Sequence, residues 1–517
     1  MYANTELAAQ GWSKVYEIYP ATEDVLRLAV INDTIYLKSH CACHNGEECS
    51  FISKIDTAGN LLDLLELYKP NRGIQIGAYS DIIKINDKLV TTGDDSWDND
   101  TLNQQTQHLY KFNENLDTFE KFQIPVVDGL VQYGGNLLYF KNKNLIITRA
   151  LKFNPKLTNK YVRVFNAINE KNELEWSYNY QNPTSFTLRD NGEIIKNSDT
   201  SFVVSMRVGW ANIQYFSMNT KGKLLWEYTE INNVDGLITP STFKPMIAPS
   251  EASDIVRAWY YDGKSSSEAN LQTEVSRISN KGDLKWQCKF PATSNLDTIQ
   301  KSGKRVWQLI KTQNGDYVGV GEAVYFHYNK DWSTKFIYTV GYAFRVGDDG
   351  SMKWERYMYD KSRQKYGLQY FYSVAEGDDG SLYFAGNIAD SIPNVPGSSL
   401  NDNIWLVKTS PDGCLTPGCD ELVPVSTKKV LNRHPDILSV YPNPGSSELN
   451  ISWGDVPSLP QRIELRSLNG SMVYKETLNG IDDHATIHAA HLPPGMYLVT
   501  LHGQDWQSLP QKWVKIE

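Results

Sequence analysis

NTKGKLLWEY, residues 219 to 228, is a polar turn followed by a strand-like run that carries a tryptophan. Three other stretches repeat this pattern: NEKNELEWSY (169 to 178), SNKGDLKWQC (279 to 288) and GDDGSMKWERY (347 to 357). In every copy the tryptophan stands four residues after the turn residue, as in Gly222 and Trp226. Asn, Asp and Gly suit the tight loops of β-hairpins, so each copy predicts one hairpin.

Weaker copies occur at DTAGNLLDL (56 to 64), FNENLDTFEKF (112 to 122) and TSPDGCLTPGC (409 to 419), which gives seven hairpins at intervals of about 50 to 70 residues. A second hairpin precedes each of them. Its outgoing strands read NDTIYLKS (32 to 39), NDKLVTTG (86 to 93), NKNLIITR (142 to 149), SDTSFVVSMRV (198 to 208), SDIVRAWYY (253 to 261), NGDYVGVGE (314 to 322) and DGSLYFAGN (379 to 387). Two hairpins make a four-stranded unit, and seven such units predict an all-β, seven-bladed β-propeller over residues 1–420.

The two ends of this region are each incomplete. After the Asp412-Gly413 turn the seventh unit has CLTPGC in place of an outer strand, whereas the segment from Trp12 to Tyr19 is a strand without a hairpin partner. We expect this N-terminal strand to pair with the strand from Asn403 to Lys408 and so close the ring, because closure leaves no sheet edge open.

Composition excludes several classes of protein. The 517 residues carry a formal net charge of −9, with a pI near 5.6, and show no basic stripe, which argues against a nucleic-acid partner. Apolar runs such as LLDLLEL (61 to 67) are far shorter than the roughly 18 residues of a membrane helix, so no membrane span is expected. The N-terminus also lacks the pattern of a secretory signal peptide.

Six cysteines suggest local bridges. Cys414 and Cys419 flank a tight turn, which predicts a disulfide in an oxidising compartment. Cys41, Cys43 and Cys49, with His44, fit either a small bridged loop or a metal site, whereas Cys288 on a Trp-bearing strand is expected to be a buried small side chain.

After Cys419 the repeat ends. Residues 421–436 are rich in Pro, Lys and Arg and are expected to form an exposed linker, and residues 437–517 alternate short strands with Pro/Gly/Asn turns, as in a small immunoglobulin-like β-sandwich. The motif residues of this last part are Tyr441, Pro442, Asn443 and Pro444, then Gly495 and Tyr497, then Lys512 and Lys515. With these motifs it resembles the type A C-terminal sorting domain of type IX secretion substrates.

That resemblance implies a route and a set of partners. A substrate of this kind would cross the periplasm and be recognised at the outer membrane by the type IX translocon and its shuttle protein, and would end up secreted or at the cell surface. In this family the sorting domain is usually removed, and a cut would fall in the linker, where Lys428, Lys429 and Arg433 lie. The propeller itself resembles secreted repeat propellers, which names no activity.

Sequence motifs for catalysis are missing: there is no nucleophile elbow, zinc-protease pair or phosphate loop. The acidic stretch GDDSWDND (93 to 100) could supply Ca²⁺ with oxygen ligands from Asp94, Asp98 and Asp100, or be a solvated loop. No other cofactor is expected.

Aromatic residues follow the second strand of several units and would share one face of the propeller, where sugar rings could stack on them, or they could wedge between blades. They are Trp97, Trp210, Tyr260, Tyr325 and Trp332. We therefore expect a binding or adhesion protein for a glycan or surface ligand. The alternatives are an extracellular polysaccharide hydrolase or lyase, and a structural part of a surface apparatus.

Overall fold

The computed structural model describes most of the chain. The described residues are 11–18, 23–43, 47–67, 74–76, 80–95, 106–125, 132–133, 136–143, 145–153, 161–180, 193–208, 212–230, 246–250, 254–261, 272–290, 300–328, 334–360, 368–389, 402–416, 418–420, 422–425, 428–430, 432–434, 438–454, 456, 459–467, 471–478, 483–503 and 506–517. Apart from one 3-10 turn at Lys141–Lys143, their regular structure consists of β-strands. None of them forms a helix long and apolar enough to cross a membrane.

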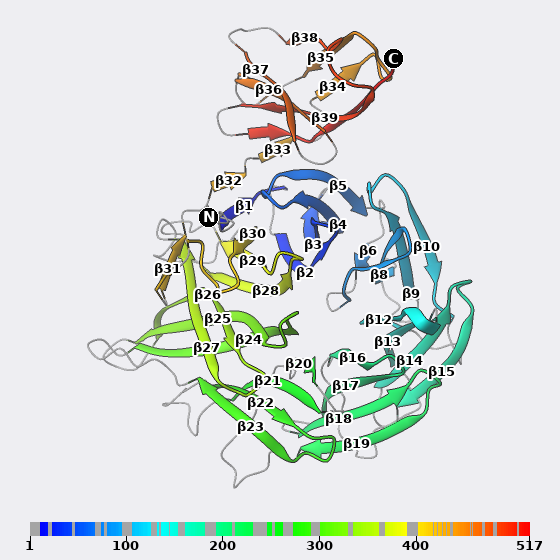
Figure 1. The fold of residues 1–517 in the computed structure, drawn as a ribbon, viewed down its shortest axis with the longest axis vertical. Helices are drawn as coiled ribbons and strands as arrows, with labels where there is room; N and C mark the ends of the chain where they lie inside the picture. Colours follow the sequence, from blue (N-terminus) through cyan, green and yellow to red (C-terminus); the bar gives the residue numbers. More distant parts are fainter. Residues whose placement is uncertain are drawn as a thin grey trace, which may run out of the picture.

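Seven sheets of mainly antiparallel strands form a ring, and two further sheets, of six and three strands, lie beside it (Figure 1). Blades one to three comprise β2 (Glu23–Ile31), β3 (Thr34–Cys43), β4 (Glu47–Asp56) and β5 (Leu61–Leu67); β6 (Ile74–Ile76), β7 (Ile83–Ile85), β8 (Lys88–Asp95), β9 (Thr106–Asn113) and β10 (Phe119–Gln123); and β11 (Gln132–Tyr133), β12 (Leu137–Phe140), β13 (Leu145–Phe153), β14 (Tyr161–Asn169) and β15 (Leu174–Tyr180).

Blades four and five comprise β16 (Ile194–Ser198), β17 (Ser201–Val208), β18 (Asn212–Asn219) and β19 (Leu224–Glu230), and β20 (Met246–Pro249), β21 (Ile255–Tyr261), β22 (Gln272–Ile278) and β23 (Leu284–Phe290). Blade six has β24 (Gln300–Lys311), β25 (Tyr317–Tyr328), β26 (Thr334–Val346) and β27 (Met352–Asp360), and blade seven has β28 (Gln369–Glu376), β29 (Leu382–Ala389) and β30 (Asp402–Thr409), completed by β1 (Trp12–Tyr16). The predicted seven-bladed propeller is confirmed.

Two tryptophans of the repeat, Trp176 and Trp354, donate a hydrogen bond to the turn of the following blade, whereas the indole N–H of Trp286 has no partner among the described residues. Trp176 of blade three donates its indole N–H to the carbonyl of Thr220 in the turn of blade four, at 2.9 Å. In the same turn Gly222 has a φ of +76°, and a Cβ there would lie 2.9 Å from the Trp176 ring. Glycine therefore serves both the turn and the close approach of the neighbouring ring, which explains why the two residues recur together.

The ring closes as predicted. β1 pairs antiparallel with β30, with Val15 opposite Trp405 and Tyr16 opposite Ile404. Trp12 then makes the contact that the repeat makes elsewhere, because its indole N–H donates to the carbonyl of Thr57 in the turn of blade one at 2.9 Å. The N-terminal strand is thus the missing outer strand of blade seven.

The faces between blades are tightly packed. On the side of blade seven that faces blade six, the rings of Phe371 and Trp405 stack with centroids 4.4 Å apart. A Cβ on Gly341 would lie 2.4 Å from the Phe371 ring and 2.8 Å from the Trp405 ring, so a side chain at this position would have to displace them. Blade-to-blade packing of this density fixes the positions of the inner strands.

Two disulfides are present among the described cysteines. Cys414 and Cys419 are bonded, as predicted. Cys41 is bonded to Cys49, directly opposite on neighbouring strands, so the bridged-loop hypothesis is confirmed and neither thiolate is available to a metal ion. Cys288 is a buried free cysteine, as expected.

The C-terminal domain is a two-sheet sandwich. One sheet contains β34 (Leu438–Tyr441), β35 (Glu448–Trp453) and β38 (His484–His488), and the other contains β33 (Asn432–His434), β36 (Arg462–Ser467), β37 (Met472–Thr477), β39 (Gly495–His502), β40 (Trp506–Ser508) and β41 (Gln511–Lys515). Its core includes Leu449, Ile463 and Trp513, none of which is exposed.

The region between the domains differs from a plain exposed linker, because it contains short strands. β31 (Leu422–Val425) runs parallel to β27, and β32 (Lys428–Val430) runs parallel to β1. The outer edges of β27 and β1 offer unpaired backbone groups, and these strands cover them.

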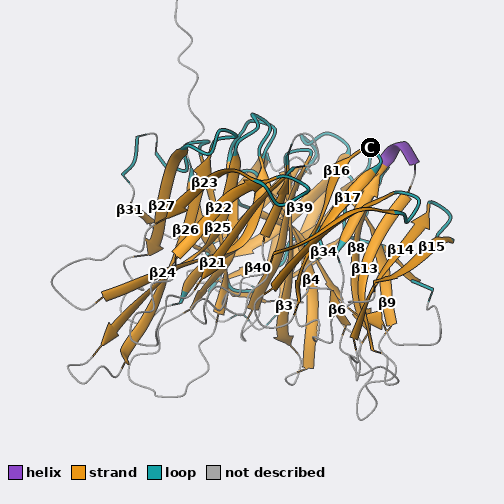
Figure 2. Cartoon of the chain, turned by 90° about the horizontal axis from the view of Figure 1, so that it is seen from below, coloured by secondary structure: helices purple, strands orange, loops and turns teal. Residues whose placement is uncertain are grey.

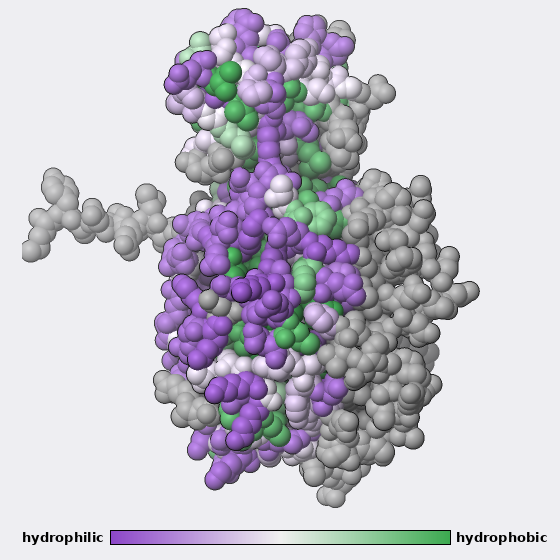
Figure 3. All heavy atoms as spheres, turned by 90° about the vertical axis from the view of Figure 1, so that its right-hand side faces the viewer, coloured by the Kyte–Doolittle hydropathy of each residue, from purple (hydrophilic) through white to green (hydrophobic). Residues whose placement is uncertain are grey.

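The solvent side of the outer strands is mixed: Phe119, Leu225, Leu284 and Met352 are each at least 40% exposed among polar residues. In β19 the residues alternate between partly buried and exposed, as in a strand with one solvated face. On the flank shown in Figure 3, hydrophilic side chains dominate the visible propeller surface.

Removing residues 1–18 should open the ring. The truncation deletes β1 with the buried Val15 and Tyr16, so we expect a loss of more than about 4 kcal/mol of stability together with association through the exposed β30 edge. Thermal unfolding and size-exclusion chromatography would measure both effects. A matched truncation of residues 1–10 keeps β1 and should melt like the full chain; equal melting temperatures for both truncations would contradict the role of β1.

Candidate functional site

The propeller has two different faces. Short hairpin turns, such as those at Asn32–Asp33 and Thr57–Gly59, lie along one face, which we call the turn face (Figure 2). At the opposite face, which we call the loop face, the inner strands begin and the second strands end. The longer connections in the sequence fall at the loop face, and this is where binding residues are usually carried on a rigid scaffold.

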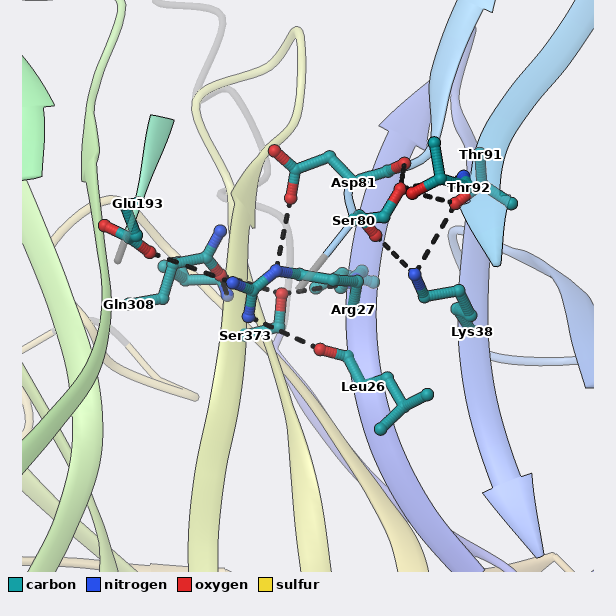
Figure 4. Close-up of polar contacts among 12 residues, drawn as sticks. Leu26, Arg27, Lys38, Ser80, Asp81, Thr91, Thr92, Glu193, Gln308 and Ser373 are labelled. Atoms are coloured by element: carbon teal, nitrogen blue, oxygen red, sulfur yellow. Dashed lines mark hydrogen bonds and ion pairs between the residues drawn. The ribbon is translucent and has the colours of Figure 1, made fainter. Parts of the chain in front are cut away.

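Arg27 of β2 stands at the axis of the ring, where charged groups of several blades meet (Figure 4). Its Nε lies 3.2 Å from a carboxylate oxygen of Asp81, next to blade two, and its Nη2 lies 3.8 Å from Oε1 of Glu193, at the start of blade four. The other oxygen of Glu193 accepts the backbone N–H of Ile247 in blade five at 2.8 Å. One arginine therefore links blades that are far apart around the ring.

Arg27, Asp81 and Glu193 form what we call the axial cluster, and further contacts between blades lie on both sides of it. Lys38, which is fully buried, donates to the carbonyl of Ser80 and to Oγ1 of Thr91, tying blade one to blade two. On the other side Ser373 of blade seven accepts the backbone N–H of Leu28 at 3.0 Å and donates to Gln308 of blade six at 2.8 Å.

Side chains near the axis also accept hydrogen bonds from backbone N–H groups of the inner strands, because the inward edges of these strands have no neighbouring strand. Gln308 accepts the N–H of Val374, and Asn387 accepts the N–H of Val25, at 2.8 and 3.1 Å. An unpaired buried N–H would be costly, so these side chains belong to the fold. Arg27 faces the carboxylates of Asp81 and Glu193, and Lys38 donates to Ser80 and Thr91, so both cations make structural contacts between blades.

Closer to the loop face, the inner strands of blades one, six and seven share an irregularity. Their registers shift between Val25 and Arg27, between Val306 and Gln308, and between Phe371 and Ser373. The inserted residues are Leu26, Trp307 and Tyr372. A β-bulge changes the direction of a side chain. Each of these three adjacent blades therefore presents one inserted side chain at a matching position of its inner strand.

Two of those residues are aromatic and touch. The rings of Trp307 and Tyr372 meet edge to face with centroids 5.1 Å apart, and Tyr370 meets Tyr372 in the same manner at 5.0 Å. All three rings are partly exposed. Beside them Arg305 pairs with Glu322 of the next strand at 2.8 Å.

Two aspartates complete this group. Asp24 of β2 lies opposite His40, and Asp402 begins β30 at the loop face. Burial, and then the charge of Asp24, raises the pKa of Asp402 to about 6. Burial also raises the pKa of Asp24, which His40 partly opposes, and no hydrogen-bond donor among the described residues reaches Oδ1 of Asp402.

We call the full set the loop-face cluster: Asp24, Arg305, Trp307, Glu322, Tyr370, Tyr372 and Asp402. Its members influence one another, because the pKa of Tyr370 is raised by burial first and then by Tyr372, Asp402, Asp24 and Glu322. The pKa of Glu322 is raised by burial despite Arg305. Carboxyl groups with raised pKa values beside partly exposed aromatic rings are typical of functional sites.

None of the residues expected from the sequence belongs to the loop-face cluster. Tyr260 falls within β21, which ends at Tyr261 as expected, whereas β25 is longer than expected and contains Tyr325; Asp94 falls within β8. The other expected residues lie outside the described part of the chain: Trp97, Trp210 and Trp332 for the ligand, and Asp98 and Asp100 for Ca²⁺. No group of three potential metal ligands is found among the described residues.

The sorting-domain motifs, which are far apart in the sequence, meet in the sandwich. Asn443 donates to the carbonyl of Lys512 at 2.7 Å and accepts the N–H of Val514 at 2.9 Å. Trp513 donates to the carbonyl of Pro442, and Gly495 lies opposite Lys515 on the adjacent strand. The Tyr-Pro-Asn-Pro turn is therefore fastened to the C-terminal strand.

Comparison with known proteins identifies this domain. Residues 439–516 match the family described as the secretion system C-terminal sorting domain. No curated protein matches the chain. The domain marks the chain as a substrate of type IX secretion, exported to the cell surface or the extracellular space.

Solved structures similar to the chain match only weakly. They include an α-L-arabinanase of Penicillium chrysogenum complexed with arabinobiose (TM-score 0.35, 9% identity, 78% of this chain and 98% of that chain) and an acylaminoacyl peptidase of Pyrococcus horikoshii (TM-score 0.39, 10% identity, 83% and 57%). A neuraminidase-like protein of subtype N10 from a bat influenza A virus has a TM-score of 0.37 and 8% identity over 61% of this chain and 94% of that chain. Likeness at this level assigns no activity.

The raised pKa of Asp402 predicts how stability changes with pH. The folded protein holds the proton of this carboxyl up to about pH 6, whereas the unfolded chain releases it near pH 4, so this group lowers stability as the pH rises from about 4 to 6. Asp402→Asn should therefore stabilise the protein at pH 7, by on the order of 1 kcal/mol after solvent screening, and have little effect at pH 3.5. Urea unfolding at both pH values checks this, and a stabilisation independent of pH would contradict it.

Proposed function

We propose that the exported propeller binds a carbohydrate-containing ligand at the loop-face cluster on blades six, seven and one. The observation that carries this proposal is the pair of aromatic residues on bulges, Trp307 and Tyr372, in edge contact and partly exposed. Aromatic rings offer apolar faces to the C–H groups of a sugar, while neighbouring charged groups can bond to its hydroxyls. Arg305, Glu322 and Asp402 provide such groups beside the rings.

The position of the cluster favours recognition from one side. Arg27 and its carboxylate partners Asp81 and Glu193 follow the bulges along the inner strands, so a ligand that uses the cluster would approach from the loop face. The inner strands are also fixed by contacts to their neighbours, so the cluster is preorganised and loses little freedom on binding.

A second candidate function is hydrolysis of a polysaccharide, favoured by one observation. Asp402 has a pKa of about 6 next to a second carboxyl, Asp24, and such a pair can divide the roles of proton donor and base. In this scheme Asp402 would give its proton to the leaving oxygen as the glycosidic bond breaks, and Asp24 would take a proton from the attacking water.

Replacing Trp307 or Tyr372 by Ala should weaken glycan binding by at least about tenfold, because each change removes a stacking surface. Glycan-array screening followed by calorimetry on the best ligand would measure this. Tyr139→Ala is the matched control, since Tyr139 is also a partly buried aromatic of an inner strand but belongs to blade three. Equal affinity of all three variants and the wild type would refute this site.

Asp402→Asn separates binding from hydrolysis. If the propeller is a hydrolase, the release of reducing ends should fall by at least about a hundredfold while the dissociation constant changes little. Assays of the wild type over a polysaccharide panel between pH 4 and 7 provide the baseline. Ligand binding without any release of reducing ends would leave the binding function and reject the hydrolase.

A further inference from the structure

We propose that the segment between the two domains is a relay of strands that ties the sorting domain to β1, and that this tie holds only while the ring is closed. On this basis, opening of the ring frees the segment and exposes its basic residues to proteases. The inference is independent of the ligand-binding function proposed above.

The first part of the relay lies on blade six. β31 pairs in parallel with β27, with Leu422 opposite Tyr357 and Val425 opposite Asp360. The partner strand β27 is present whether or not the N-terminus is in place, so this part anchors the segment after the Cys414–Cys419 bridge.

The second part depends on ring closure. β32 pairs in parallel with β1, with Lys14 opposite Lys428 and Tyr16 opposite Val430. The other side of β1 pairs with β30. Since β1 comes from the far end of the chain and is the only strand between β30 and β32, departure of β1 leaves β32 without its partner.

The third part belongs to the sorting domain. β33 begins two residues after β32 ends and pairs in parallel with β40, with Arg433 opposite Gln507. Two residues of extended chain span about 7 Å, so the sandwich has little room to move away from β1 while both pairings hold.

A side-chain contact adds a second attachment on the neighbouring blades. Lys512 of β41 lies 3.0 Å from a carboxylate oxygen of Asp63 on β5, and its Nζ donates to the carbonyl of Asn115 in the turn of blade two at 3.3 Å. Both side chains of the ion pair are partly buried. The sorting domain beside β5 in Figure 1 is therefore held at two points.

The consequence concerns proteolysis. A protease needs a segment that can leave its strand neighbours and enter the active site in extended form, so paired strands are cut mainly after local opening. Lys428 and Lys429 lie in β32, and Arg433 lies in β33. Ring closure should thus protect all three peptide bonds, and ring opening should expose those in β32 first.

Limited trypsin digestion of the full chain, with mass spectrometry to locate the cuts, tests the relay. Trp12→Ala weakens the closing seam, and Trp176→Ala is its control, because each indole donates a 2.9 Å hydrogen bond to the turn of the next blade. We expect Trp12→Ala to speed cleavage at Lys428 and Lys429 by at least about tenfold, and Trp176→Ala to leave those sites protected.

Equal cleavage of the segment in both variants would overturn the relay, as would cutting of the wild-type segment at the rate of the urea-unfolded chain. If Trp12→Ala fails to fold, Trp12→Phe with Trp176→Phe keeps the rings and removes only the hydrogen bonds. The relay then requires faster cleavage in Trp12→Phe alone, and unchanged cleavage in both would reject it.

Discussion

The pairing of β1 with β30 is the interaction on which the rest of the structure depends. A ring of sheets has no first or last member, whereas the chain that forms it has two ends, so one blade must be assembled from both. Placing Trp12 in the outer strand of blade seven gives this blade the same contact to the next turn that Trp176 makes elsewhere. The seam between the ends therefore repeats the contact between blades three and four, and without β1 the edges of β30 and β32 would both be open.

The sequence predicts this architecture because its signals are local. A turn residue and a tryptophan four positions later both lie in one hairpin, and the contact of Trp176 with Gly222 repeats the same register in the next unit. The closing strand was predictable for a related reason, since an orphan strand and an incomplete unit are both visible in the pattern. The strands between the domains were not, because a three-residue strand such as β32 carries no periodicity and exists only through the edge it covers.

The loop-face cluster could not be predicted from the sequence, for two physical reasons. Trp307 and Tyr372 stand on bulges, where one inserted residue changes the direction of a side chain without changing the apolar composition of the strand. Asp24 and Asp402 are far apart in the chain and meet only because blade seven precedes blade one in the closed ring. The signal that could have found them is the common position of Leu26, Trp307 and Tyr372 in their repeats, which requires an alignment of the units on their inner strands.

One inner strand, β2, contributes a residue to both the axial cluster and the loop-face cluster. In β2, Arg27 faces Asp81 and the buried Glu193, and Leu28 donates its N–H to Ser373 of blade seven; removing one partner of a buried pair such as Arg27–Glu193 typically costs about 3 to 5 kcal/mol. Asp24, three residues earlier, lies opposite His40, and burial raises its pKa. Within three residues β2 therefore carries a carboxyl group with a raised pKa, Asp24, and an ion-paired arginine, Arg27. Since the ring holds all the inner strands at fixed positions, loops at one face can vary in length without disturbing the contacts of Arg27, which suits an exported propeller with the binding site proposed above.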